Sequence, residues 1–138
     1  MAQQTLLVIN GDILTEVNFQ ALLAYHREQK ATLTVAVRKY DMSVPYGVLK
    51  TEGVFVRSLV EKPLISLFVN AGIYLLEPEA RRHVPGGEHF DMTDLIQCLL
   101  AAGLPVVSFP IHEYWLDIGQ HADYAQAQED IRNGRMSN

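Results

Sequence analysis

The chain has 138 residues, of which 49% are hydrophobic and 20% charged, and it carries a net charge of −5. This is the length and composition of one globular domain, and the lack of a Lys/Arg block argues against nucleic-acid or anionic-membrane partners. There is no signal peptide and no apolar run long enough to span a bilayer, so we expect a cytoplasmic protein. A single cysteine, Cys98, excludes an intrachain disulfide and a cysteine-based zinc site, and we expect a buried, inert thiol.

The first predicted element is the apolar run Leu6 to Ile9, which stops at Asn10-Gly11-Asp12. A continuous apolar run closed by turn residues is typical of a buried strand in a parallel sheet. Ligands of open α/β sheets bind outside the carboxyl ends of the strands, and Asp12 falls at that edge. The same three residues are also common in simple strand-ending turns, so the strand alone does not decide between a site and a turn.

The middle of the chain reads as a helix, a strand and a hairpin. Asn18 is a helix cap, and the side chains that share one helix face are Phe19, Leu22, Leu23 and His26. Leu33 to Val37 has the pattern of a second buried strand. The segments 46–50 and 54–60 flank Thr51-Glu52-Gly53, which predicts an antiparallel hairpin inserted into the sheet.

The second half continues the alternation of strands and helices. The expected elements are a strand over 69–76, a short helix opened by Pro78, a helix over 91–100 capped by Asp91, strands over 106–109 and 114–116, and a last helix after Gly119. In the 91–100 helix the predicted apolar stripe contains Met92, Leu95, Ile96, Leu99 and Leu100. The predicted stripe of the last helix contains Tyr124, Ala127, Gln128 and Ile131, and Asn133-Gly134 ends that helix.

Two motifs near the middle of the chain have polar side chains where apolar strands end or are interrupted. Glu61-Lys62-Pro63 follows a strand; it is either a surface charge pair before a proline turn or a site in which Lys62 neutralises a phosphate and Glu61 accepts hydrogen bonds from sugar hydroxyls. Asn70 sits in an apolar strand beside Gly72, and its amide needs a partner. That partner is either a ligand hydroxyl or the backbone of a turn.

Asp117 supplies a second carboxylate at a strand end, in Trp115-Leu-Asp-Ile-Gly119. It is either a helix cap or a partner of Asp12 in binding a divalent cation. Mg²⁺ prefers one or two carboxylates plus waters and substrate phosphates, which fits two aspartates without nitrogen ligands.

The histidines give no sign of a metal site or a hydrolase. None of the five has the His-Glu-x-x-His spacing, and there is no Gly-x-Ser-x-Gly elbow. We expect surface positions for all of them: His26, His83, His89, His112 and His121.

Taken together, five short motifs resemble the sugar-1-phosphate nucleotidylyltransferases, most closely the mannose-1-phosphate guanylyltransferase type and its glucose-1-phosphate thymidylyltransferase relatives. The motifs occur in the order found in that family and cover nearly the whole chain. They are Leu7-Val-Ile-Asn-Gly-Asp12, Tyr46-Gly-Val48, Val60-Glu-Lys-Pro63, Asn70-Ala-Gly-Ile-Tyr74 and Trp115-Leu-Asp-Ile-Gly119.

The resemblance implies a Rossmann-like α/β nucleotidylyltransferase fold, with a mixed, mainly parallel sheet and an inserted antiparallel hairpin. It implies a reaction in which a hexose-1-phosphate attacks the α-phosphate of a nucleoside triphosphate and releases pyrophosphate. Asp12 and Asp117 would hold the catalytic Mg²⁺, and Lys62 would bind the sugar phosphate. The implied sugar-binding residues are Glu61, Gly47, Asn70 and Gly72.

One family feature is not found in the sequence. Members of the family have a Gly-rich loop of the type Gly-Gly-x-Gly-Thr-Arg-Leu that cradles the triphosphate, and here eleven residues precede Asp12 without such a loop. We therefore expect residues 1–138 to form a partial domain that holds the metal and sugar-phosphate side. The alternative is a non-catalytic, sugar-phosphate-binding or structural module completed by another chain. An uncovered sheet would also favour self-association. A phospho-accepting receiver domain fits less well, because receivers lack the hairpin and the Glu-Lys-Pro turn.

Overall fold

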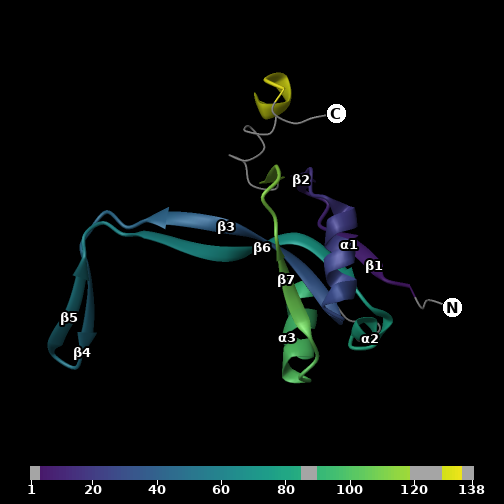
Figure 1. Ribbon diagram of the computed structural model, residues 1–138, viewed down its shortest axis with the longest axis horizontal. Coiled ribbons are helices and arrows are strands. Elements are labelled where there is room, and N and C mark those ends of the chain that lie inside the picture. The colour runs from purple at the N-terminus through teal and green to yellow at the C-terminus, as the bar shows by residue number, and fades with distance from the viewer. Residues whose placement is uncertain (1–3, 85–89, 119–128, 135–138) are drawn as a thin grey trace.

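The computed structural model describes residues 4–84, 90–118 and 129–134, and these residues form an α/β domain with a long two-stranded extension (Figure 1). The elements are β1 (Leu6–Ile9), β2 (Ile13–Thr15), α1 (Phe19–Glu28), β3 (Leu33–Ser43), β4 (Val48–Glu52), β5 (Phe55–Val60), β6 (Leu64–Leu76), α2 (Pro78–Arg81), α3 (Met92–Ala101), β7 (Val106–Pro110) and β8 (Trp115–Asp117). The order of the predicted elements is confirmed up to β8, but the sequence analysis missed the short strand β2 and made β3 and β6 too short. The predicted last helix falls largely on residues 119–128, which lie outside the described residues.

The main sheet has four strands in the order β1-β6-β3-β7. β3 and β7 are parallel, whereas β6 runs antiparallel to both of its neighbours. Three of the four strands therefore point the same way, and the α/β mixed sheet expected from the sequence is confirmed.

The expectation that β1 is a buried strand of a parallel sheet was wrong. Within the described residues β1 pairs only with β6, antiparallel, so it is an edge strand. Its apolar side chains keep much of their surface, with 42% of Leu6, 42% of Leu7 and 41% of Ile9 exposed. An apolar run cannot distinguish a central strand from an edge strand, because both can be equally hydrophobic.

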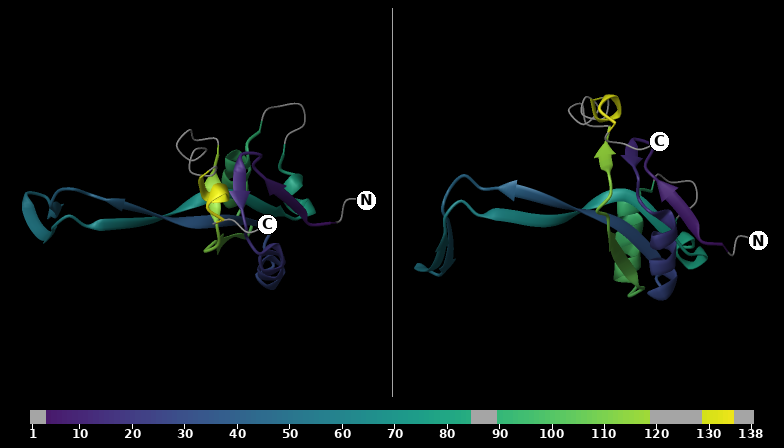
Figure 2. Two further views of the ribbon diagram at one scale, coloured as in Figure 1. Left: turned by 90° about the horizontal axis from the view of Figure 1, so that it is seen from above. Right: turned by 45° about the horizontal axis from the view of Figure 1, so that its top comes forward.

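The core lies on both faces of this sheet. Alternate residues of a strand point to opposite faces, and β6 follows this rule: Ile73 and Leu75 belong to one buried cluster, and Tyr74 and Leu76 to another. Helix α1 closes the first cluster with Leu22, and helix α3 closes the second with Leu95 and Leu99. Figure 2 shows the two helices on either side of the sheet.

Helix α3 corrects two further expectations. Its cap at Asp91 is confirmed, with a capping box formed by Asp91 and Asp94. However, Leu100 is 59% exposed and Cys98 is exposed, although we expected both on the buried face. Leu95 and Leu99 are four residues apart and already fill the contact with the sheet. Their neighbours are rotated by about 100° around the helix and face outward.

The outer halves of β3 and β6 leave the core as a ribbon that carries the β4–β5 hairpin at its far end (Figure 1). We call residues 39–68 the arm. The predicted hairpin is confirmed, with Gly53 in its turn at a φ of +61°. Large apolar side chains of the arm are exposed, among them Tyr46 at 73%, Phe55 at 65% and Phe68 at 70%.

None of the helices in the described part of the chain is both long and apolar enough to cross a membrane.

Candidate active site

Asp12 and Asp117, far apart in sequence, lie side by side at one end of the main sheet. Asp117 is the last residue of β8, and its partner across the β2–β8 ladder is Ile13, the residue after Asp12. The backbone N–H of Ile118 donates a hydrogen bond to the carbonyl oxygen of Asp12 at 2.7 Å. Asp12 is exposed and Asp117 is half-buried, so both carboxylates belong to an accessible surface.

An irregularity in β6 holds this end of the molecule together. Between the pairs Val35–Tyr74 and Val37–Asn70, three residues of β6 stand opposite a single residue of β3, so part of β6 leaves the ladder. Its freed carbonyl groups take other donors. The backbone N–H of Asn10 donates to the oxygen of Gly72 at 2.9 Å, and the indole Nε1–H of Trp115 donates to the oxygen of Ala71 at 2.6 Å. The bulge thus binds the segments that carry both aspartates.

Gly72 is required at the bulge for two reasons. Its φ is +76°, a backbone conformation that residues other than glycine rarely adopt. A Cβ atom at this position would also lie 2.7 Å from Nδ2 of Asn10 and 3.2 Å from Cγ1 of Ile13. Glycine therefore lets the Asn10–Asp12 turn pack directly on β6.

The side chain of Asn70 has its partners within the protein. Its Oδ1 accepts the backbone N–H of Gly72 at 2.8 Å, and its Nδ2 donates to the hydroxyl of Tyr74 at 2.8 Å. Of the two partners left open by the sequence, the structure shows the backbone one. Asn70 is therefore placed to stabilise the bulge.

A pocket of about 440 Å³ adjoins the aspartate turn, and sequence reasoning missed it. Its lining residues are Asn10, Tyr74, Phe90, Asp91, Met92 and Thr93. The pocket lies between the turn after β1 and the start of α3, and no sequence motif links these two segments. The only signal in the sequence is that Asn10 and Asp91 each stand at an element end.

The remaining predicted site residues form a second group at the base of the hairpin. Gly47 lies beside Glu61, since a Cβ at Gly47 would be 3.3 Å from Oε2 of Glu61. Lys62 has a positive φ of +46°, and its backbone N–H donates to the oxygen of Tyr46 at 3.2 Å. The structure does not bring this group to the aspartates. Asn70 is separated from Leu64, the start of β6, by roughly 20 Å of extended strand, and the hairpin lies beyond it (Figure 1).

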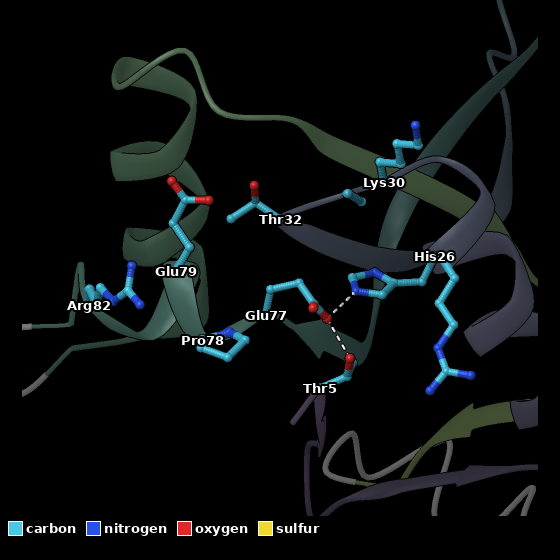
Figure 3. Close-up of a pocket in the computed structure, with 10 residues that line it drawn as sticks. Thr5, His26, Lys30, Thr32, Glu77, Pro78, Glu79 and Arg82 are labelled. Carbon is cyan, nitrogen blue, oxygen red and sulfur yellow. Dashed lines mark hydrogen bonds and ion pairs between the residues drawn. The ribbon is translucent and has the colours of Figure 1, made fainter. Parts of the chain in front are cut away.

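A buried histidine lies at the opposite end of the sheet and corrects another expectation. His26 is 1% exposed, and both of its ring nitrogens have oxygen partners within the protein. Nδ1 is 2.6 Å from the Thr34 hydroxyl, and Nε2 is 2.8 Å from Oε2 of Glu77. Thr5 also donates to this carboxylate, as Figure 3 shows.

The environment of Glu77 favours its ionised form. Burial by itself would raise the pKa of Glu77, but hydrogen bonds from Thr5 and His26 and the charges of His26 and Arg27 outweigh burial and lower the pKa. The adjoining pocket of about 480 Å³ is lined by basic side chains and by the carboxylates of Glu77 and Glu79 (Figure 3). It is remote from both groups of predicted site residues.

The two aspartates have the donor chemistry of a magnesium site that shares its ligands with a substrate. In the described residues there is no cluster of three or more His, Cys, Asp or Glu side chains that would enclose a metal by itself. Two carboxylates leave coordination positions for water and phosphate oxygens, which is the arrangement that Mg²⁺ prefers. Asp12 and Asp117 each offer carboxylate oxygens of this kind, and water and substrate phosphate would supply the remaining ligands.

Comparison with known proteins gives a consistent match. Residues 1–134 match the family model described as nucleotidyl transferase. The chain is 30% identical to a UTP–glucose-1-phosphate uridylyltransferase of Synechocystis sp., a match that covers 97% of this chain and 37% of that protein. It is 30% identical to a mannose-1-phosphate guanyltransferase of Schizosaccharomyces pombe, over 85% of this chain and 33% of the relative. The chain thus spans about a third of the length of these curated relatives.

Among solved structures, the crystal structure of HddC from Yersinia pseudotuberculosis superposes with a TM-score of 0.64 at 25% identity. The match covers 95% of this chain and 57% of that one. The fold described above is therefore also found in an experimental structure.

Proposed function

Because this chain belongs to the nucleotidyl transferase family, we propose that residues 1–138 form the metal-binding and sugar-phosphate-binding part of a nucleotide-sugar synthase. The complete enzyme joins a nucleoside triphosphate to a hexose-1-phosphate and releases pyrophosphate. Relatives named mannose-1-phosphate guanyltransferase support mannose-1-phosphate and GTP as the first pair to test.

The observation that carries the proposal is the adjacency of Asp12 and Asp117 across the β2–β8 ladder. In such a reaction a phosphate oxygen of the sugar-1-phosphate attacks the α-phosphorus, and the bond to the pyrophosphate leaving group breaks. This chemistry requires positioning of two anions and neutralisation of their charge, without a protein nucleophile. A bound Mg²⁺ would supply that neutralisation, with Asp12 and Asp117 fixing its place.

The positions of the other predicted residues limit how they could take part in this reaction. Asn70 and Gly72 shape the backbone beside the aspartates, whereas Gly47, Glu61 and Lys62 lie together on the arm. For Lys62 to bind the sugar phosphate and Glu61 the sugar hydroxyls, the arm has to bend toward the Asp12–Asp117 edge. The proposal therefore includes a change in the direction of the arm when substrate binds.

A second candidate is a non-catalytic module that another chain completes. The separation of Lys62 from the aspartates and the exposed apolar side chains of the arm favour it. This candidate predicts metal or sugar-phosphate binding by the isolated chain but no turnover.

The deciding experiment measures pyrophosphate release by the folded chain with Mg²⁺, each of GTP, dTTP, UTP, CTP and ATP, and mannose- or glucose-1-phosphate. In an active, full-length enzyme that contains these residues, we expect turnover to be abolished by Asp12→Asn and Asp117→Asn and to require more sugar phosphate in Lys62→Ala. Asp41→Asn, a carboxylate of the arm that accepts a hydrogen bond from Ser66, is the matched control and should leave turnover unchanged.

Silence with every substrate pair would favour the second candidate, provided that Mn²⁺ still binds to the wild type and not to Asp117→Asn. Turnover that survives in Asp117→Asn would refute the two-aspartate metal site.

A further inference from the structure

The side chain of Arg38 stacks on the ring of Trp115, the one tryptophan of the chain. The guanidinium carbon of Arg38 lies 4.7 Å from the ring centroid, within the range of a cation–π contact. The indole itself is anchored, because its Nε1–H donates to the Ala71 carbonyl of the β6 bulge. Arg38 on β3 is thereby held against β8 at the same end of the sheet as the aspartates.

The strand geometry places Arg38 on the side of Asp117. Trp115 and Asp117 are two residues apart in β8, so their side chains point to the same face of the strand. Their Cα atoms are separated by roughly 7 Å, the length of two strand residues. A guanidinium stacked on Trp115 therefore borders the surface onto which Asp117 projects.

The hydrogen-bonding capacity of Arg38 is not used by the residues that the structure describes. Its neighbour Lys39 is paired with Asp41 at 3.9 Å, and Arg57, the other stacked arginine, is paired with Glu52 at 3.5 Å. For Arg38 no carboxylate or carbonyl partner is found in the described ranges, only the Trp115 ring. Stacking occupies the flat face of a guanidinium and leaves its five in-plane N–H groups directed outward.

Such a group is suited to a phosphate. A planar fork of N–H donors matches two phosphate oxygens at once, and the charge strengthens both hydrogen bonds. The charge balance leads to the same ligand. Two carboxylates and one divalent cation sum to zero, so a phosphoryl group bound at that metal brings negative charge that a nearby arginine offsets.

We propose that Arg38 is a phosphate-binding residue of the Asp12–Asp117 site. The inference rests on the proposed function and adds to it a cation that stands beside the metal pair without any movement of the arm. The phosphoryl group belongs either to the sugar-1-phosphate or to the nucleotide-derived pyrophosphate, since the two share the chemistry that a guanidinium recognises.

The test uses the intrinsic fluorescence of Trp115 in the full 138-residue chain. Because the chain has no other tryptophan, its emission reports directly on the group stacked against Arg38. In the presence of Mg²⁺ we expect mannose-1-phosphate or pyrophosphate to change the emission of the wild type saturably. For Arg38→Gln the affinities for these ligands are measured by isothermal titration calorimetry, because the substitution itself changes the surroundings of Trp115 and therefore its fluorescence.

We expect Arg38→Gln to weaken binding of at least one of the two ligands by about 10-fold or more, in keeping with the loss of charge-assisted hydrogen bonds. Loss confined to mannose-1-phosphate identifies the sugar phosphate as the bound group, and loss confined to pyrophosphate identifies the nucleotide side. Arg57→Gln removes a stacked arginine from the hairpin and is the matched control, with unchanged affinity expected.

Wild-type affinity of Arg38→Gln for both ligands would overturn the proposal, and so would a wild type that binds neither. A purely structural role of Arg38 would lower the melting temperature of Arg38→Gln without changing these affinities. Mn²⁺ binding separates this outcome from a failure of the proposed function: Arg38→Gln should still bind Mn²⁺, whereas Asp117→Asn should not.

Discussion

Substitution of Gly72 by alanine tests whether the β6 bulge holds the aspartate turn in place. The change adds one methyl group at a residue whose φ is +76°. A non-glycine residue in this left-handed region costs about 1–2 kcal/mol. The added Cβ would also lie 2.7 Å from Nδ2 of Asn10, closer than real contacts of this kind, so the Asn10 side chain or its backbone has to move.

Gly103 provides a matched reference for separating these two effects. It has nearly the same φ, +72°, but no atom lies within 4 Å of an added Cβ. Gly103→Ala should therefore cost only the conformational penalty of about 1–2 kcal/mol. Gly72→Ala should cost about 1–3 kcal/mol more, the usual range for forcing an extra carbon into a packed site.

The assay is urea unfolding of wild type and both variants, monitored by circular dichroism, together with Mn²⁺ affinity. We expect Mn²⁺ binding to weaken in Gly72→Ala and to remain unchanged in Gly103→Ala, because only the first displaces the segment that carries Asp12. Equal destabilisation and equal Mn²⁺ affinity in the two variants would refute the idea that the close packing of Asn10 on Gly72 positions the site.

Three further outcomes are expected. The pKa of Glu77 is lowered in the folded state, so its ionised carboxylate stabilises the protein above the ordinary pKa of 4.5, and this contribution is lost as the pH falls through the folded pKa. Melting temperatures over this acidic range should therefore fall more steeply for the wild type than for Glu77→Gln, and parallel curves would contradict this. Leu99→Ala should cost about 2–5 kcal/mol in a chemical unfolding experiment because Leu99 is fully buried, whereas Leu100→Ala should cost far less; similar values would place Leu100 in the core. Cys98 is exposed and should react with a thiol reagent in the native protein at the rate of an accessible cysteine, and reaction only after denaturation would disprove its exposure.

The local elements could be read from the sequence because their signals are local. Asn18 accepts the N–H of Ala21 as a helix cap, Pro78 opens α2, and Gly53 lies in the hairpin turn, as their residue types predict. Such preferences depend on the backbone geometry of a few neighbouring residues, which the rest of the chain does not have to supply.

Burial was harder to predict, because it depends on what packs against a residue. His26 reads as a surface side chain of α1, but partners from β3 and from the end of β6 enclose it. Cys98 and Leu100 were predicted to be core residues, but the face of α3 that contacts the sheet is narrower than the stripe of apolar residues on the helix, and both lie outside it. Which face of α3 is buried depends on the sheet that it packs against, and the helix sequence alone does not fix it.

By itself, the sequence determined most of the elements and their order, though not β2, together with the family and the candidate residues Asp12, Lys62 and Asp117. Only the tertiary structure decided which of these candidates meet. Pairing of β2 with β8 and the bulge at Gly72 bring the two aspartates together, and stacking on Trp115 adds Arg38, which no motif had indicated. The extended path of β3 and β6 holds Lys62 away. Proximity between distant residues arises from strand register and packing, which involve the whole chain at once and leave no mark in any short segment.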